Sequence, residues 1–323
     1  IMEQAEKWKV CPFEMALDVS LWSDAIICDY NYVFDPQAKL KRFFAEGVKG
    51  DYLFLIDEAH NLVERGREMY SAALYKEDFL EVKRFLKPFS RKAVAALERG
   101  NKYLLEWKRE CEEYTLLSNI DSFALNLFNV SHALEQLLED RESVMNRPST
   151  DSEIEEGKKK TLDFYFQVRA FLEIYEELDD SYEIYVQHDR EGRFALKLYC
   201  IHTADKIGQC LEKGRASILF SATLLPVQYY MELLSGKSED YAVYARSTFD
   251  PARKKVLLGL DVSTKYTRRT PAEYQKIASY IRQITDSRQG NYLVFFPSYK
   301  MMTDVRAYFE VEMQDDTEIL EQN

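Results

Sequence analysis

The chain of 323 residues has little of what marks secreted or membrane-bound proteins. Its five cysteines are an odd number and include no CxxC pair, which argues against a disulfide framework and favours a reducing, cytoplasmic setting. No apolar run approaches the roughly 20 residues of a membrane helix. No basic segment followed by an apolar one marks a signal peptide. We therefore expect a cytoplasmic protein with no membrane partner.

Positive charge is also in short supply. The 43 lysines and arginines are outnumbered by 55 aspartates and glutamates, which gives a net charge of −12. This balance argues against a broad basic surface for nucleic acid, but a local basic groove remains compatible with it because charge can be segregated between domains. The 46% apolar content is that of an ordinary globular protein, and the length suffices for two or three domains.

Glycine and proline nearly vanish between residues 65 and 180, where only five occur. Apolar residues in segments 123–137 and 165–175 recur at spacings of three and four, which predicts amphipathic helices. The polar segment 146–160 predicts an exposed loop between them. This region therefore reads as a long, all-helical insertion.

Strand-like segments flank the helical region. The apolar run 52–56 follows a glycine and predicts a buried strand of a parallel sheet. Further strands are predicted at 25–28, at 182–201 (two strands around a turn), at 216–226, at 255–262 and at 290–299. Helices are expected at 271–286 and 298–313. The predicted class is α/β with parallel sheets, interrupted by the helical insertion.

Polar residues stand where several of these strands end. Asp57 and Glu58 follow the run 52–56, Ser221 and Thr223 follow 216–220, and a Pro-Ser pair follows 290–296. Ligands of open parallel sheets bind at the carboxyl ends of the strands. An Asp there can hold Mg²⁺ beside phosphate oxygens, and a neighbouring Glu can activate water. The competing interpretation is that Asp57 only caps the following helix; we favour the chemical one.

The segments around these residues resemble conserved motifs of the superfamily 2 iron–sulfur DNA helicases of the XPD/DinG (Rad3-like) type. "LFLIDEAHNL" matches motif II, "ILFSATLLP" resembles motif III, and "GNYLVFFPSY" resembles motif IV. "CPFE" followed by "IICDYNYVFDP" is similar to the exit from the iron–sulfur domain of that family. The motifs come in the family's order and span essentially the whole chain.

The resemblance implies an ATP- and Mg²⁺-dependent motor that moves on single-stranded DNA, usually 5′ to 3′, and unwinds forked duplexes. Asp57 would coordinate Mg²⁺, Glu58 would be the base for water, and His60 would help to couple hydrolysis to DNA. Three residues would link the ATP site to the strand: Ser221, Ala222 and Thr223. Cys11 would be one of four ligands of a 4Fe–4S cluster, as its Cys-Pro context suits.

The same resemblance divides the chain into RecA-like motor segments and an Arch-type insertion. Residues 1–70 would hold the end of the iron–sulfur region and the first part of motor domain 1. Residues 71–190 would be the insertion, 191–236 the return to motor domain 1, and 237–323 the start of motor domain 2. The oligomeric state stays open, with a monomer as the working expectation.

Few residues of the sequence indicate where DNA would bind. Six residues are our candidates for contacts with DNA: Tyr30, Asn31, Lys265, Arg268, Arg269 and Ser298. Five further side chains could touch the backbone or stack on bases: Tyr32, Lys39, Lys41, Arg42 and Tyr266. For each of them, a solvated charge or a packed aromatic ring is an equally open interpretation. The cluster in "TKYTRRT" (264–270) is the strongest.

Some parts of an ATP motor are missing from the sequence. No GxxxxGKS or GxxxxGKT loop is present, and the other three cluster cysteines and motifs V and VI are absent. The chain begins at Ile1 rather than Met, so we expect it to be a piece of a longer protein. Without a phosphate loop and an arginine finger, worth roughly 10³–10⁵ in rate, this piece alone is expected not to hydrolyse ATP. The alternatives left open are a different nucleotidase with a helical insertion and a non-enzymatic helical nucleic-acid-binding scaffold.

Overall fold

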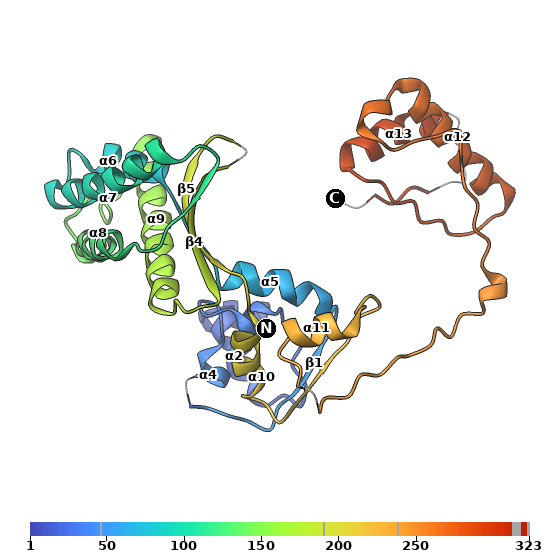
Figure 1. Ribbon diagram of the computed structural model, residues 1–323, viewed down its shortest axis with the longest axis horizontal. Helices are drawn as coiled ribbons and strands as arrows, with labels where there is room; N and C mark the ends of the chain where they lie inside the picture. The colour runs from blue at the N-terminus through green and yellow to red at the C-terminus, as the bar shows by residue number, and fades with distance from the viewer. Residues whose placement is uncertain (46, 190, 238, 312–317, 322–323) are drawn as a thin grey trace. The chain divides into compact units, whose positions relative to one another are not determined.

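The computed structural model of the chain (Figure 1) describes residues 1–45, 47–189, 191–237, 239–311 and 318–321. Two compact units divide the chain, residues 1–242 and 243–323. Across these described ranges, no helix is both long and apolar enough to cross a membrane.

The first unit contains a pair of short parallel strands, β1 (Leu53–Ile56) and β6 (Ala216–Leu219). Leu53 pairs with Ala216 and Ile56 pairs with Leu219, so segments far apart in the sequence lie side by side. The helices of this part are α1 (Met2–Trp8), α2 (Pro12–Ser20), α3 (Asn31–Phe34), α4 (Lys41–Phe44), the 3-10 turn η1 (Ala59–Asn61), α5 (Leu62–Met69), α10 (Ala204–Leu211) and α11 (Val227–Leu233). We call this part of the unit the paired-strand region.

The prediction that the run 52–56 is buried needs correction. The strand exists, but of its four residues only Ile56 is buried, while Leu53 and Leu55 are 69% and 68% exposed. Parallel sheets are normally covered on both faces by helices and neighbouring strands. Within the described residues β1 has one pairing partner, β6, so most of its apolar surface stays uncovered.

The insertion combines helices with a second sheet. Its elements are β2 (Ala72–Tyr75), α6 (Lys76–Leu86), α7 (Arg91–Glu110), β3 (Tyr114–Leu116), α8 (Asp121–Glu139), α9 (Ser152–Glu176), β4 (Tyr182–His188) and β5 (Phe194–Cys200). The four strands form an antiparallel sheet in the order β2-β5-β4-β3, and the helices gather on one side of the long β4–β5 hairpin (Figure 1). The α/β class with parallel pairing and a long helical insertion is confirmed, but the insertion is not all-helical as expected.

One large core holds the insertion together. Phe123 is fully buried, with its ring centroid 6.2 Å from that of Phe79 and 5.4 Å from that of Trp107. Gly100 of α7 allows this close packing, because a Cβ there would lie 2.7 Å from a ring carbon of Phe79. The apolar spacing of three and four that predicted the helices therefore marks the side chains that fill this core.

The loop predicted at 146–160 is shorter than expected. Helix α9 already begins at Ser152, where the side chain of Asp151 accepts a hydrogen bond from the Glu153 N–H at 2.9 Å. An Asp at this position satisfies a backbone donor that has no partner within the helix. The polar residues 152–160 thus form the first turns of a helix rather than a loop.

The second unit contains η2 (Pro251–Arg253), η3 (Tyr266–Arg268), α12 (Pro271–Ser287) and α13 (Tyr299–Val311). Both helices were predicted, and their facing sides share a small core around Ala278, Met301 and Val305. The strands predicted at 255–262 and 290–299 are wrong for this structure, since neither segment pairs as a strand and residues 260–261 form a turn and 297–298 a bend. The strand predicted at 25–28 is likewise absent. A strand requires a partner for its backbone groups, and β-propensity alone does not supply one.

Candidate functional site

The turn after β1 is held against the end of β6 by backbone hydrogen bonds. The N–H of Phe220 donates to the Ile56 carbonyl at 3.0 Å, and the N–H of Ala59 donates to the Phe220 carbonyl at 3.1 Å. Between them, Glu58 adopts a left-handed conformation with φ of 46°. Such a conformation is uncommon for a residue with a Cβ, and the bonds on either side hold it in place.

Four side chains from the two strand ends meet above this turn. The Ser221 hydroxyl donates to Oε2 of Glu58 at 3.1 Å and lies 2.7 Å from Nδ1 of His60. The same Nδ1 lies 3.2 Å from Glu58 Oε2. The Thr223 hydroxyl lies 3.3 Å from both His60 Nδ1 and Ser221 Oγ. Residues that the sequence placed at two separate strand ends therefore form one hydrogen-bonded group, which we call the strand-end cluster.

Ser221 lies at the centre of the strand-end cluster. Its hydroxyl donates to the Glu58 carboxylate, and the same oxygen lies 2.7 Å from His60 Nδ1. These contacts orient the Glu58 carboxylate, whose side chain is 55% exposed and accessible to a small molecule.

Asp57 stands beside the cluster rather than inside it. Its Oδ1 accepts the N–H of Glu58 at 2.7 Å, and the residue is exposed. Neither η1 nor α5 begins with a side-chain cap, so the structure gives Asp57 no capping bond to these helices. An exposed carboxylate at the carboxyl end of a strand fits the preference of Mg²⁺ for hard oxygen ligands shared with phosphate and water.

The backbone of Asp57 is contacted by Tyr30. The Tyr30 hydroxyl donates to the Asp57 carbonyl. Partial burial, and then the nearby Asp57 and Glu58 carboxylates, raise the pKa of Tyr30. This candidate for DNA contact therefore lies directly beside the strand-end cluster, with its hydroxyl turned toward motif II.

Other candidates of the first unit lie on α3 and α4. Asn31 is the first residue of α3, and its N–H donates to Asp29 Oδ1 at 3.0 Å. The ring of Tyr32 lies 6.4 Å from that of Phe13. Lys39 is half-buried, and Lys41 is exposed at the start of α4.

Arg42 is engaged within the chain. Its guanidinium bonds to the carboxylate of Asp18 and lies 3.4 Å from that of Glu14, both on α2. Much of its charge is thus already compensated, which weakens it as a contact for a phosphate backbone. The sequence gave no signal for this pairing because it depends on how α2 and α4 pack.

The second unit brings two distant DNA candidates together. Nη1 of Arg269 lies 3.4 Å from the Ser298 hydroxyl, and Nε donates to the Thr264 carbonyl at 3.1 Å. Ser298 Oγ also accepts the N–H of Met301 at 3.3 Å, at the first turn of α13. The segment 264–270 is thereby joined to the start of that helix.

The remaining residues of this cluster point outward. Tyr266 is 84% exposed, and its ring lies 5.6 Å from the Arg269 guanidinium. Lys265 and Arg268 are exposed, and Arg268 lies 3.8 Å from the buried carboxylate of Glu273. An exposed aromatic ring among three cations is a suitable surface for bases and phosphates.

Cys11 is exposed and stands just before α2. Among the described residues, no group of three or more His, Cys, Asp or Glu side chains is placed to hold a metal ion. A 4Fe–4S cluster requires four ligands, so these residues do not form such a site by themselves.

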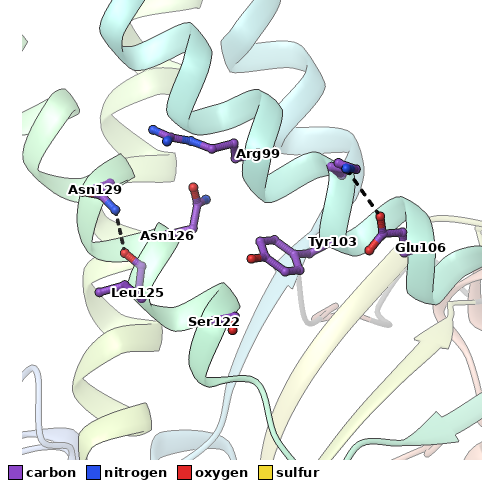
Figure 2. Close-up of a pocket in the computed structure, with 8 residues that line it drawn as sticks. Arg99, Tyr103, Glu106, Ser122, Leu125, Asn126 and Asn129 are labelled. Atoms are coloured by element: carbon purple, nitrogen blue, oxygen red, sulfur yellow. Dashed lines mark hydrogen bonds and ion pairs between the residues drawn. The ribbon is translucent and has the colours of Figure 1, made fainter.

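Sequence reasoning missed a hollow in the insertion (Figure 2). It has a volume of about 360 Å³ between α7 and α8, and it is lined by Arg99, Lys102, Tyr103, Glu106, Ser122, Leu125, Asn126 and Asn129. Asn126 donates to the Ala96 carbonyl at 3.2 Å, which ties the two helices together. In the sequence, the polar residues Ser122, Asn126 and Asn129 recur at helical spacing and so mark the side of α8 that lines this hollow.

Comparison with known proteins agrees with the motifs at these strand ends. The family model DEAD_2 matches residues 1–79. Over 311 residues the chain is 26% identical to the ATP-dependent DNA helicase XPD of Sulfolobus acidocaldarius, covering 93% of this chain and 50% of that protein. The chain is thus similar in sequence to the XPD-type DNA helicases. The resemblance drawn from the sequence motifs is thereby confirmed.

Further relatives agree with this assignment. The ATP-dependent DNA helicase CHL1 of Candida albicans is 20% identical over 357 residues, covering 96% of this chain and 41% of that protein. The Fanconi anemia group J protein homolog of Gallus gallus is 32% identical over 71 residues, or 22% of this chain and 5% of that protein. The chain thus spans at most about half the length of these curated relatives.

A solved structure designated XPD_APO resembles the chain with a TM-score of 0.47 and 18% sequence identity. The match covers 95% of this chain and 60% of that one.

Proposed function

We propose that this chain is part of an ATP-dependent DNA helicase that couples ATP hydrolysis to movement on single-stranded DNA and to unwinding of forked duplexes. The strand-end cluster carries the proposal, because it joins the predicted base Glu58 to Ser221 of the neighbouring motif by a 3.1 Å hydrogen bond. The names of the XPD and CHL1 relatives support DNA as the partner and ATP as the fuel. We call the longer protein that would contain this chain the parent protein.

In this proposal each residue of the site has a separate role. Asp57 holds the Mg²⁺ that accompanies ATP, and Glu58 accepts a proton from the attacking water. His60, Ser221 and Thr223, with Ala222 between the last two, transmit changes at Glu58 to the strand β6 and the segment after it. The hydrogen bond from Ser221, which also contacts His60, keeps the Glu58 carboxylate oriented while it acts.

The domain arrangement follows the same proposal. Residues 1–70 and 191–236 contribute to motor domain 1, residues 71–190 form the Arch-like insertion, and residues 237–323 begin motor domain 2. The uncovered apolar faces of β1 and β6 support this division, since Leu55 and Ile218 are 68% and 59% exposed. Parallel strands of a working motor domain need further strands and helices over these faces.

The iron–sulfur cluster is a separate part of the proposal. Cys11 would supply one thiolate, and residues of the parent protein outside this chain would supply the other three. Iron analysis and visible absorbance of the parent protein test this directly. Cys11→Ser should lower the iron content, whereas Cys111→Ser, a change at a buried cysteine of the insertion, should leave it intact.

The DNA surface proposed for the second unit consists of Lys265, Arg268, Arg269 and Ser298. Arg268→Ala in the parent protein should weaken binding of single-stranded DNA and reduce the salt dependence of that binding by about one counterion. Arg253→Ala is the matched control, because it removes one charge from the same unit at a residue whose side chain is 90% exposed. Equal losses in the two variants would show that the effect is general charge rather than a site.

Strand separation tests the function as a whole. The parent protein should unwind a forked DNA duplex when ATP and Mg²⁺ are present and should leave it intact when ATP is omitted. ATP hydrolysis without any strand separation or DNA dependence would favour the alternative of a different nucleotidase. DNA binding without hydrolysis would favour the helical scaffold.

We also propose the cytoplasm as the location. None of the five cysteines forms a disulfide, which a reducing compartment favours.

A further inference from the structure

Helix α3 lies against the segment that carries motif II. It spans Asn31–Phe34 and packs against α5 and α10. Its last residue, Phe34, is 1% exposed and belongs to the core beneath the strand-end cluster. The DNA candidates Asn31 and Tyr32 lie on the same helix and are half-buried.

A hydroxyl fixes the first end of α3. Tyr30 precedes the helix, and its hydroxyl donates to the carbonyl of Asp57. That carbonyl belongs to the first residue after β1, where the predicted metal ligand and base begin. The start of α3 is therefore tied to the start of motif II.

A second hydroxyl fixes the other end. Tyr70 follows α5, is 5% exposed, and donates to the carbonyl of Phe34 at 2.8 Å. Its oxygen also lies 3.6 Å from the Cys210 sulfur of α10. The end of α3 is therefore tied to the end of the helix that follows motif II.

The two bonds span the whole segment from Asp57 to Tyr70. An element that is held at both ends to another element moves with it, whereas a single bond would allow rotation about that point. We propose that Tyr30 and Tyr70 are positioning residues. They make α3 move together with the segment 57–70 and so couple the ATP site to the contacts of α3 with single-stranded DNA. This inference rests on the proposed function and names the contact through which the two sites communicate.

The buried position of Tyr70 suits a lasting hydrogen bond. Burial, and then the neighbouring Cys210, raise the pKa of Tyr70. The Tyr70 hydroxyl therefore keeps its proton through neutral and mildly alkaline pH and remains a donor to the Phe34 carbonyl.

Removal of the Tyr30 and Tyr70 hydroxyls, one at a time, tests the proposed coupling in the parent protein. Tyr70→Phe should leave ATP turnover without DNA within about twofold of the unmodified protein, and it should lower the stimulation by single-stranded DNA by about fivefold. Tyr30→Phe, which keeps the ring for any stacking on bases, should lower the stimulation to a similar extent. The matched control is Tyr175→Phe, which removes a hydroxyl that donates to Asp121 at 2.5 Å within the insertion and should change neither quantity.

A second readout separates coupling from folding. The affinity for single-stranded DNA is measured with a non-hydrolysable ATP analogue and without nucleotide, and the ratio of the two affinities should approach one in Tyr70→Phe and Tyr30→Phe. A merely structural role would lower both affinities and leave their ratio unchanged, which would overturn the proposal.

The remaining outcomes are equally distinct. If a folded Tyr70→Phe protein keeps the full stimulation of ATP turnover by single-stranded DNA, the proposed coupling is wrong. If circular dichroism shows that Tyr70→Phe does not fold, Tyr30→Phe at its half-buried position is used instead. Full stimulation of ATP turnover by DNA in that variant shows that the proposed coupling is wrong. If the unmodified parent protein shows no stimulation by DNA, the proposed function itself has failed.

Discussion

The insertion and the paired-strand region of the first unit differ in how completely they cover their apolar side chains. In the insertion, Phe79, Phe123 and Phe171 are fully buried in one large core. In the paired-strand region, Leu53 and Ile218 of the two strands are 69% and 59% exposed. The insertion therefore packs a large core of its own, whereas the strands that present the candidate site leave much of their apolar surface exposed.

The largest expected effect is on ATP turnover, because the proposed base Glu58 lies in the paired-strand region. Glu58→Gln in the parent protein should lower ATP turnover by about 10²–10⁴-fold, since the amide cannot accept a proton from water. ATP binding, measured by equilibrium titration, should persist because Asp57 is unchanged. Turnover within threefold of the unmodified protein would show that Glu58 is not the base.

The insertion should instead respond in stability. Phe123→Ala should lower the free energy of unfolding by about 3–5 kcal/mol, because Phe123 is fully buried among aromatic rings and its loss leaves a cavity. Urea unfolding followed by the fluorescence of Trp107 measures this, with Trp8 and Trp22 replaced by Phe. The control is Phe249→Ala, a change at a ring that is 85% exposed. Similar losses in the two variants would contradict the picture of a self-supporting core.

A smaller loss of stability is expected at a tightly packed glycine of the insertion. Gly100→Val should cost about 1–3 kcal/mol, because a Cβ at this position would lie 2.7 Å from the Phe79 ring and 3.0 Å from Asn126 Nδ2. Gly192→Val is not a suitable control because its φ of 80° adds strain of its own. Gly290, where a Cβ would meet nothing within 4 Å, provides the comparison. If the same fluorescence measurement shows an unchanged free energy of unfolding for Gly100→Val, the space beside Gly100 is larger than the structure shows.

The smallest effect should come from the uncovered strand. Leu55→Ala in the 323-residue chain should change the stability by less than about 0.5 kcal/mol, since its side chain is largely exposed. In the parent protein the same change should cost about 2 kcal/mol or more, because a covered leucine leaves a cavity when it is truncated. Thermal unfolding of both proteins gives the comparison. Equal effects would mean that this face of β1 stays open in the motor.

Much of the insertion could be predicted because its helices depend on local periodicity. The spacing of Phe123, Leu127 and Val130 identifies the buried side of α8 before any tertiary contact is known. The strands at 53–56 and 216–219 were also predicted, since the first is an apolar run close after a glycine and the second ends in small polar residues. The segments 255–262 and 290–299 were not strands, because pairing requires a partner that composition does not reveal.

The candidate site was predictable in its members but not in its bonds. The strand-end rule drew attention to Glu58 and Ser221, and the parallel pairing of β1 with β6 explains why they meet. Nothing in the sequence indicated that Tyr70 would reach the Phe34 carbonyl, because a tyrosine hydroxyl finds its acceptor only once the helices have packed. The pairing of Arg42 with Asp18 was hidden for the same reason.

The most direct test of the central claim is ATP turnover by the parent protein as single-stranded DNA is titrated in. The account predicts that turnover rises with DNA and saturates, and that Glu58→Gln abolishes it at every DNA concentration. Turnover that is indifferent to DNA, or that survives Glu58→Gln, would contradict the account.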